Sequence, residues 1–200
     1  MNHMKKLLIF LFCSVFAFAQ NDLASAEKFQ AELNQSYADS SKSPLMKADL
    51  KAFKGLDFFP LNEKYIVEAK FVRTKKEKAF GMKTTTSRTP LYVKYGELHF
   101  TIDGKDLKLN VYKNIDLSKK PGYEDYLFLP FSDLTCGKES YIGGRYVDMK
   151  IQKGKTWTID FNKAYNPYCA YSHRYSCPIP PVENQLTISI DAGEKTPEEH

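Results

Sequence analysis

The sequence predicts an all-β domain, a sandwich or barrel-like arrangement of antiparallel sheets, with one or two N-terminal helices. Alternating apolar and polar residues recur in short runs from Tyr65 onwards, with turn signals at a spacing of roughly ten residues. Four-residue apolar spacing is confined to the segment before Gly55. Asp103-Gly104 separates two alternating runs and predicts a hairpin with a type I′ turn. Strands outnumber helices, so an α/β fold is a poor alternative.

The first 19 residues have the pattern of a secretory signal peptide. Lys5 and Lys6 precede an apolar run over residues 7–18, and Ala17-Phe18-Ala19 supplies a small-residue cleavage site. The run is shorter than the roughly 20 residues that cross a membrane, so no membrane span is expected after cleavage before Gln20. We therefore expect a secreted or periplasmic protein.

Residues 20–55 are expected to form a helical segment packed on the body of the protein. Asp22 can cap a helix over residues 23–39, whose apolar face consists of Phe29, Leu33 and Tyr37. Pro44 follows a serine in a cap and first-turn pattern, which predicts a second, short helix that Gly55 ends.

Residues 56–192 are expected to form a single β-rich domain. The first strand alternates over residues 65–72, and Tyr126 to Leu129 form a buried strand that Pro130 should end. Further strands are expected over residues 91–95, 98–102, 107–111, 141–150, 157–161 and 186–190. Residues 193–200 are expected to form a flexible tail.

The net charge is too small to indicate a nucleic-acid partner. The chain has 29 basic and 24 acidic residues, a net charge of +5, and removal of Lys5 and Lys6 lowers it to +3. The basic residues are scattered along the sequence, whereas nucleic-acid-binding proteins gather them on one face. A small anionic ligand remains compatible with this composition.

The stretch from Thr156 to Asn184 is the most unusual part of the sequence. Four prolines exclude a helix or a central strand, and its aromatic content excludes disorder. Long ordered loops are commonly functional. Tyrosines are concentrated here and just before it, and they either form a small core for the loop or line a groove: Tyr141, Tyr146, Tyr165, Tyr168, Tyr171 and Tyr175.

Three cysteines follow the expected cleavage site. Cys169 and Cys177 are close in sequence and are expected to form a disulfide, which leaves Cys136 over. His173 lies between the pair, but a structural zinc site needs a fourth ligand that the sequence does not place nearby. A nucleophilic cysteine with His173 or His99 is a further alternative. We expect no metal and no cofactor.

Several segments resemble a known family. The chain resembles the bacterial family catalogued as domain of unknown function 1684, which is exported and uncharacterised. The matching segments are Lys54-Gly55-Leu56-Asp57-Phe58-Phe59-Pro60, Phe131-Ser132-Asp133-Leu134-Thr135, Gly143-Gly144-Arg145-Tyr146, Asp160 to Tyr171, Cys177-Pro178-Ile179-Pro180-Pro181 and Ala192-Gly193-Glu194. The resemblance covers most of the chain and implies no assigned activity.

The polar residues of these segments are the candidate site. If they converge, a guanidinium and amide groups would hold a carboxylate or phosphate beside two acids. The alternative is a structural ion pair that fixes the long loop. The candidate ligand-binding residues are Asp133, Arg145, Asp160, Asn162, Asn166 and Tyr171.

These observations predict an exported β domain that binds a small polar or anionic ligand, or a partner. The expected cleft lies between residues 133–145 and 160–184. One alternative is a hydrolase that uses Asp133 and Asp160 as acid and base, which requires two carboxylates at a defined separation. Another is a purely structural envelope protein.

Overall fold

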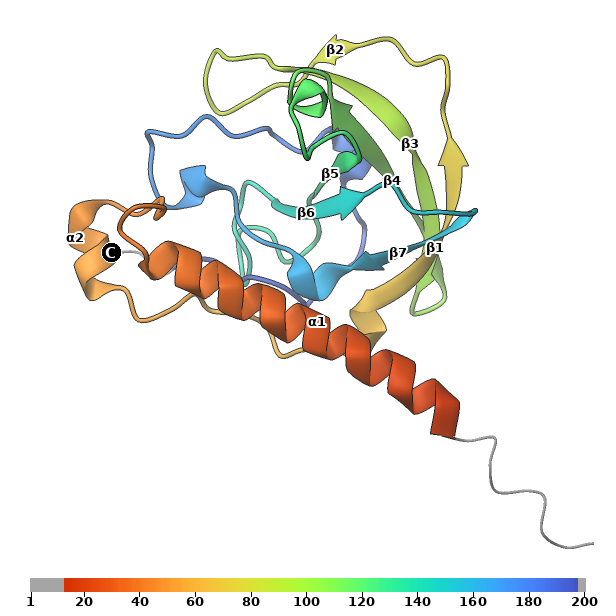
Figure 1. Cartoon of the computed structure of the whole chain (residues 1–200), viewed down its shortest axis with the longest axis horizontal. Coiled ribbons are helices and arrows are strands. Elements are labelled where there is room, and N and C mark those ends of the chain that lie inside the picture. The colour runs from red at the N-terminus through yellow and green to blue at the C-terminus, as the bar shows by residue number, and fades with distance from the viewer. Residues whose placement is uncertain (1–12, 198–200) are drawn as a thin grey trace, which may run out of the picture.

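The computed structural model describes residues 13–197, so most of the predicted signal peptide lies outside the described residues. Within that range, seven strands form one antiparallel sheet that curves into a half-barrel (Figure 1). The strand order is β6-β5-β4-β3-β1-β7, with β2 paired to β3. The predicted all-β class is confirmed. The strands are β1 (Ile66–Arg73), β2 (Phe80–Gly81), β3 (Leu91–Ile102), β4 (Lys105–Asn114), β5 (Tyr126–Phe131), β6 (Arg145–Lys150) and β7 (Thr156–Asp160).

Helix α1 (Cys13–Ala38) is the one long helix among the described residues, and it lies along one side of the half-barrel (Figure 1). It confirms the helix expected from residue 23 and begins ten residues earlier, at Cys13. Helix α2 (Lys47–Ala52) is a short helix of six residues. No helix of the described part of the chain is both long and apolar enough to cross a membrane. Short 3-10 turns complete the fold: η1 (Glu63–Tyr65), η2 (Leu117–Lys119), η3 (Phe161–Lys163), η4 (Tyr168–Ala170) and η5 (Val182–Asn184).

The hairpin between β3 and β4 has the predicted turn. Asp103 and Gly104 have φ values of 50° and 72°, as a type I′ turn requires at both central residues. Further along the pair, the register shifts between Lys94 and Gly96. A Cβ atom at Gly96 would overlap the Phe71 ring, so glycine allows β1 and β3 to approach here.

The connection between β6 and β7 accounts for the curvature of the sheet. These strands are the two ends of the strand order, yet only residues 151–155 join them. Such a loop spans about 20 Å when extended, whereas the strands of this order laid flat would span about 24 Å. The sheet must curl to bring its edges within reach of each other.

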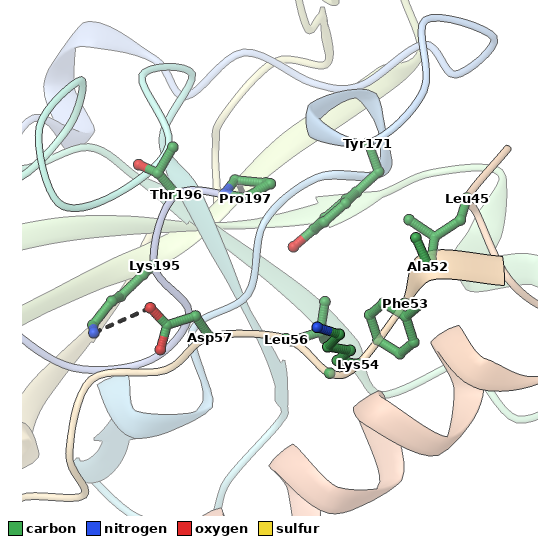
Figure 2. A pocket seen from close by; sticks show the side chains of 11 residues that line it. Leu45, Ala52, Phe53, Lys54, Leu56, Asp57, Tyr171, Lys195, Thr196 and Pro197 are labelled. Atoms are coloured by element: carbon green, nitrogen blue, oxygen red, sulfur yellow. Dashed lines mark ion pairs between the residues drawn. The ribbon is translucent and has the colours of Figure 1, made fainter. Parts of the chain in front are cut away.

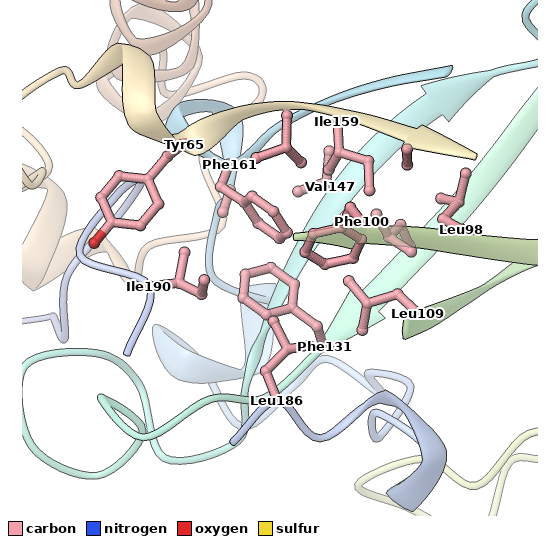
Figure 3. Close-up of a cluster of buried hydrophobic side chains, with 14 of the residues drawn as sticks. Tyr65, Leu98, Phe100, Leu109, Phe131, Val147, Ile159, Phe161, Leu186 and Ile190 are labelled. Carbon is pink, nitrogen blue, oxygen red and sulfur yellow. The ribbon is translucent and has the colours of Figure 1, made fainter. Parts of the chain in front are cut away.

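The concave face of the half-barrel holds the main hydrophobic core (Figure 3). The ring of Phe161 lies 5.8 Å from that of Phe100 and 5.2 Å from that of Phe131. The segment after η5 also enters this core, because Leu186, Ile188 and Ile190 are all buried. The apolar alternation therefore identified the inward side chains, but residues 186–190 form no strand. The backbone bonds of this segment go to the loop after β5, where Leu186 N–H donates to Ser132 O at 2.8 Å and Leu134 N–H donates to Ile188 O at 3.1 Å.

Two strand boundaries also differ from the prediction. Pro130 does not end its strand, since β5 continues to Phe131 and Pro130 pairs with Tyr146 of β6. The strand expected from residue 141 begins at Arg145, because Gly144 N–H donates to Tyr141 O at 3.1 Å and Gly144 has a φ of +81°. A turn therefore occupies the start of that segment.

The predicted flexible tail is anchored over its described residues. The N–H groups of residues 194, 195 and 196 donate to Ala164 O, Asp57 O and Glu139 O at 2.8, 2.9 and 3.0 Å. Glu194 is 1% exposed. Three separate loops therefore hold residues 194–196, a result that the polar composition of the tail did not indicate.

The long loop after β7 is ordered by aromatic packing and by bonds at both ends. Tyr146 and Tyr165 exchange backbone hydrogen bonds at 2.9 and 3.0 Å. Tyr168 and Tyr171 pack edge-on against Tyr37 of α1, with ring centroids 6.0 and 5.0 Å from its own. At the far end, the Asn184 amide donates to carbonyls of β4 and β5. Tyr168 and Tyr171 thus pack between the loop and α1, whereas Tyr146 packs against Phe128 of β5.

Candidate functional site

Arg145 and Asp133 form a buried ion pair beneath the C-terminal segment. Arg145 NH2 lies 2.7 Å from Asp133 Oδ2, and both side chains are 0% exposed. The guanidinium also donates to the carbonyl oxygens of Ile190, Ala192 and Glu194. The other Asp133 oxygen accepts from the N–H and hydroxyl of Thr135. This arrangement fixes the backbone and leaves no carboxylate oxygen facing solvent.

Asp160 and Asn162 hold a different part of the chain. Asp160 Oδ1 accepts from the backbone N–H and the amide of Asn162 at 3.0 and 2.9 Å. The Asn162 amide also pairs with the backbone of Asn62 in both directions. Gln30 of α1 donates to Asn162 O at 2.9 Å. These residues join α1 and the chain before β1 to the end of β7.

The six candidates therefore divide into three local networks. The geometry offers no support for a hydrolase that uses Asp133 and Asp160, because Asp133 is sealed and Asp160 caps η3 and pairs with Lys163 at 3.4 Å. Acid–base work on a substrate needs a carboxyl group within hydrogen-bond reach of it. Asn166 and Tyr171 make up the third network, and this one meets a cavity.

Glu194 is the centre of that third network. Its Oε2 accepts the Asn166 backbone N–H at 2.7 Å, and its Oε1 accepts the Tyr171 hydroxyl. The Asn166 amide donates to Lys195 O at 2.7 Å. Glu194 was expected in the flexible tail and was not among the predicted site residues. Its position in the segment Ala192-Gly193-Glu194, which carries the family resemblance, was the signal that indicated it.

Burial changes the ionisation of this network. Loss of solvent around Glu194 raises the pKa of its carboxyl group to about 7, although the hydrogen bonds from Asn166 and Tyr171 and the charge of Arg145 oppose the shift. Burial, followed by the charge of Glu194, raises the pKa of the Tyr171 hydroxyl well above its usual range. Tyr171 therefore stays protonated and donates to Glu194.

Tyr171 also lines a cavity of about 570 Å³, the Tyr171 pocket (Figure 2). Figure 2 shows its hydroxyl pointing into the space between α2 and the C-terminal segment. Lys195 closes one side, where its Nζ lies 3.1 Å from Asp57 Oδ2. The lining residues are Leu45, Ala52, Phe53, Lys54, Gly55, Leu56, Asp57, Tyr171, Lys195, Thr196 and Pro197.

A second, smaller cavity lies partly between residues 133–145 and 160–184, the segments expected to form the cleft, but none of the predicted site residues lines it. Its volume is about 160 Å³, and Tyr141 comes from the first segment while the second contributes Cys169, His173 and Tyr175. The thiols of Cys169 and Cys177 are free, so the predicted disulfide is not present in the structure. No three metal-ligating side chains of the described residues are grouped to hold an ion, which gives the zinc alternative no support.

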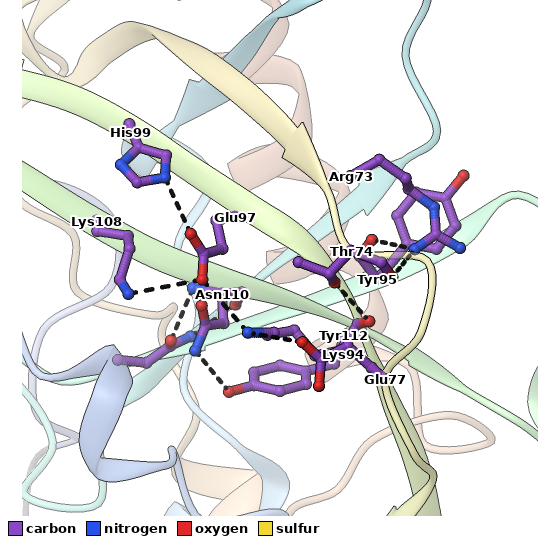
Figure 4. Close-up of polar contacts among 11 residues, drawn as sticks. Arg73, Thr74, Glu77, Lys94, Tyr95, Glu97, His99, Lys108, Asn110 and Tyr112 are labelled. Carbon is purple, nitrogen blue, oxygen red and sulfur yellow. Dashed lines mark hydrogen bonds and ion pairs between the residues drawn. The ribbon is translucent and has the colours of Figure 1, made fainter.

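His99 belongs to a charge cluster on the sheet (Figure 4). Its Nε2 lies 3.1 Å from Glu97, which also pairs with Lys94 at 3.3 Å and Lys108 at 3.6 Å. Only the Glu97–Lys108 pair crosses from β3 to β4, and a cross-strand charge pair of this kind stabilises neighbouring strands. His99 is therefore engaged by Glu97, and the structure gives no support to its pairing with a cysteine.

A family model described as "Protein of unknown function (DUF1684)" matches residues 51–195. The chain belongs to this family. The DUF1684 match includes Lys54, Tyr171 and Lys195 of the Tyr171 pocket and also Glu194, whereas α1 lies before it.

Solved structures confirm the fold of this DUF1684 domain. The chain is similar to an uncharacterised protein of Haloarcula marismortui, whose structure was determined in solution by NMR, with 32% sequence identity and a TM-score of 0.71. The similarity covers 92% of this chain and 99% of the other. No match was found among curated proteins.

Proposed function

We propose that this DUF1684 domain binds a small molecule with an anionic head and an apolar part in the Tyr171 pocket. The observation that carries the proposal is a cavity that combines an apolar wall with two lysines, which outnumber the one acidic residue of the lining. Its volume of about 570 Å³ falls in the range of roughly 300–1,000 Å³ that small-molecule sites occupy.

The apolar wall comes from α2 and the turns beside it. Leu45, Ala52 and Phe53 line this side, and Figure 2 shows them grouped together. Phe53 also packs against Tyr37 with ring centroids 6.3 Å apart, which fixes the position of its ring. This wall suits an aliphatic or aromatic group of the ligand, because burying such surface stabilises a complex.

Lys54 and Lys195 line the cavity from different sides, Lys54 beside Phe53 and Lys195 beside Asp57 (Figure 2). Lys195 is paired with Asp57, whereas no carboxylate of the described residues lies within ion-pair distance of Lys54. The Tyr171 hydroxyl adds a polar group (Figure 2). The pocket lining therefore has one positive charge in excess, which favours a carboxylate or phosphate over an amine.

The proposal is tested by identifying ligands and then by titration. Native mass spectrometry of the purified chain would reveal a co-purified molecule without assuming its class. Octanoate and octylamine then serve as probes of matched shape and opposite charge, with binding followed by isothermal titration calorimetry. We expect saturable binding of octanoate and none of octylamine.

A matched pair of charge reversals locates the binding site. Lys54→Glu should weaken octanoate binding at least tenfold, because it replaces a positive charge of the cavity lining by a negative one. Lys51→Glu makes the same change in net charge at an exposed position of α2 that does not line the cavity, and it should bind octanoate as the parent chain does. Equal binding of octylamine, or equal effects of the two substitutions, would refute the proposal.

We also propose that the protein is exported. The proposal is supported by the basic residues Lys5 and Lys6, the apolar run that follows them and the Ala17-Phe18-Ala19 site. Amino-terminal sequencing of the protein expressed in its own host tests it. A mature chain that begins at Gln20 would support export, and an intact Met1 in the cell fraction would contradict it.

A further inference from the structure

Cys169 and Cys177 lie side by side although neither thiol is oxidised. The backbone N–H of Cys169 donates to Cys177 Sγ at 3.1 Å. Cys169 is partly exposed, whereas Cys177 is 6% exposed. The two sulfur atoms therefore share one environment but differ in their access to solvent.

Both cysteines are held in place by the chain around them. Cys169 is the middle residue of η4, which begins after Pro167. Cys177 pairs with Thr85, whose backbone N–H donates to Cys177 O at 2.9 Å and whose hydroxyl accepts the Cys177 N–H at 3.1 Å. The approach of the two thiols is thus part of the fold.

The smaller cavity opens onto one of the two thiols. Cys169 lines it and Cys177 does not. A volume of about 160 Å³ is small, so it suits the end of a slender molecule or an extended side chain. An external disulfide that enters this cavity reaches Cys169, whereas Cys177 is buried and does not line the cavity. The cavity is lined by Thr85, Thr86, Tyr141, Cys169, His173 and Tyr175.

The pKa shifts of the two thiols also differ, and they favour Cys169 as the thiolate. A hydrogen bond from Cys177, with further hydrogen bonds from Tyr141 and Thr85, lowers the pKa of Cys169 to about 7 against the effect of its burial. The same hydrogen bond to Cys169, together with burial, raises the pKa of the Cys177 thiol. A thiolate is the nucleophile in thiol chemistry, and an attacking thiol is most effective when its pKa lies near the ambient pH.

We propose that Cys169 and Cys177 form a redox-active dithiol that reduces low-molecular-weight disulfides, with Cys169 as the attacking thiol and Cys177 as the resolving thiol. The Cys169 thiolate attacks one sulfur of a disulfide RSSR, forms a mixed disulfide and releases RS⁻, which takes up a proton. Cys177 then gives its proton to solvent and attacks Cys169 Sγ. This step forms the Cys169–Cys177 disulfide and releases the second RS⁻, so that oxidation of two thiols balances reduction of RSSR to two RSH.

A redox-active pair differs from the structural disulfide expected from sequence in one respect. A structural bridge is protected from solvent and resists reduction, whereas a labile one is exposed. Here the cavity leaves Cys169 accessible in the reduced protein. Cys136, the third cysteine after the predicted cleavage site, lies near Ser140 and the Asp133 N–H and does not line this cavity.

Intact-mass spectrometry of the reduced full chain treated with glutathione disulfide tests the proposal, with Cys13 replaced by serine in the parent chain and in every variant. The parent chain should lose two hydrogen atoms and carry no glutathione, and dithiothreitol should reverse the change. Cys177→Ser should trap one glutathione on Cys169. Cys169→Ser should react at least tenfold more slowly, and Cys136→Ser should behave as the parent chain.

Peptide mapping of the oxidised parent chain gives a result that does not depend on the folding of any variant. It should show a Cys169–Cys177 bridge, and Cys177→Ala provides a second trapping variant if the serine is poorly tolerated in its buried position. Three results would overturn the proposal: no reaction of the parent chain, a stable glutathione adduct on Cys136 or Cys169 in that chain, or a bridge that dithiothreitol does not reduce.

Discussion

The guanidinium of Arg145 contacts the carboxylate of Asp133 at 2.7 Å, and neither side chain is exposed. The same guanidinium donates to three carbonyl groups of residues 190–194. The pair therefore joins β6, the loop after β5 and the C-terminal segment. That segment continues into Lys195, which lines the Tyr171 pocket. The pair therefore helps to position one side of the pocket, although neither Arg145 nor Asp133 lines it.

Asp133→Asn should destabilise the fold strongly. The substitution preserves the shape of the side chain, but it turns one acceptor oxygen into a donor and removes the carboxylate that pairs with the buried Arg145 charge. Breaking a buried pair in this way costs about 3–5 kcal/mol. The free energy of unfolding, measured by urea denaturation, should fall by that amount. Asp125→Asn is the control, because Asp125 forms a surface pair with Lys150 at 3.9 Å and should change stability by less than about 1 kcal/mol. Equal effects of the two substitutions would contradict the structural role.

Substitutions at two glycines with positive φ distinguish the cost of backbone strain from the cost of steric crowding. Gly104 has a φ of +72° with nothing within 4 Å of an added Cβ, whereas Gly193 has a φ of +76° and its Cβ would lie 2.5 Å from Ala164 O. Gly104→Ala should cost about 1–2 kcal/mol from strain alone. Gly193→Ala should cost about 1–3 kcal/mol more, because it also crowds the backbone. Thermal unfolding followed by circular dichroism measures both, and a smaller loss for Gly193→Ala would show that the C-terminal segment is not held as described.

Asn184→Ala tests the anchor at the end of the long loop. The Asn184 side chain accepts the Asn110 N–H at 2.8 Å and donates to Asn110 O and Pro130 O at 2.8 and 2.6 Å, all in a buried setting. Alanine leaves these backbone groups without partners, so we expect a loss of about 2–4 kcal/mol in urea denaturation.

The control for that change makes the same kind of contact at the surface. Gln152 pairs with both backbone groups of Thr158 at 2.8 and 2.9 Å in an exposed position. In Gln152→Ala, water replaces the lost bonds, and the expected loss is below about 1 kcal/mol. A loss in the free energy of unfolding as large as that of Asn184→Ala would mean that burial does not determine the cost of losing these hydrogen bonds.

The parts of the fold that sequence predicted depend on local signals. The Asp103-Gly104 turn is specified by the positive φ that glycine tolerates, and the inward residues of the strands follow from a period of two. The Arg145–Asp133 pair was one of two alternatives, and burial selected it. The order of the Thr156 to Asn184 loop followed from its aromatic content.

The parts that sequence missed depend on contacts between distant segments. Residues 186–190 have the alternation of a strand, but their partners lie in the loop after β5, and no local pattern shows this. Lys54 and Lys195 are far apart in the sequence and line the same cavity only in the folded chain. Glu194 was assigned to a tail because its neighbours are polar. The amino-acid composition does not show the backbone carbonyl groups that hold the tail in the folded chain.

Glu194 makes the stability of the protein depend on pH in a predictable direction. Its pKa is about 7 in the folded chain and 4.5 in the absence of perturbation. Between these values the folded state binds the proton and the unfolded state has released it. The contribution of this group is therefore fully present below pH 4.5 and is lost as the pH rises through 7, with a total on the order of 3 kcal/mol.

Glu194→Gln should remove this dependence. Glutamine cannot ionise, so the variant should show a flatter decline in the free energy of unfolding between pH 4.5 and 7.5 than the parent chain, when both are measured by urea denaturation at constant ionic strength. Its amide also replaces one acceptor facing Asn166 or Tyr171, so a constant loss is expected at every pH. Glu139→Gln, at an exposed position, should reproduce the parent slope. Parallel curves for the parent chain and Glu194→Gln would show that the carboxyl group of Glu194 does not take up its proton on folding.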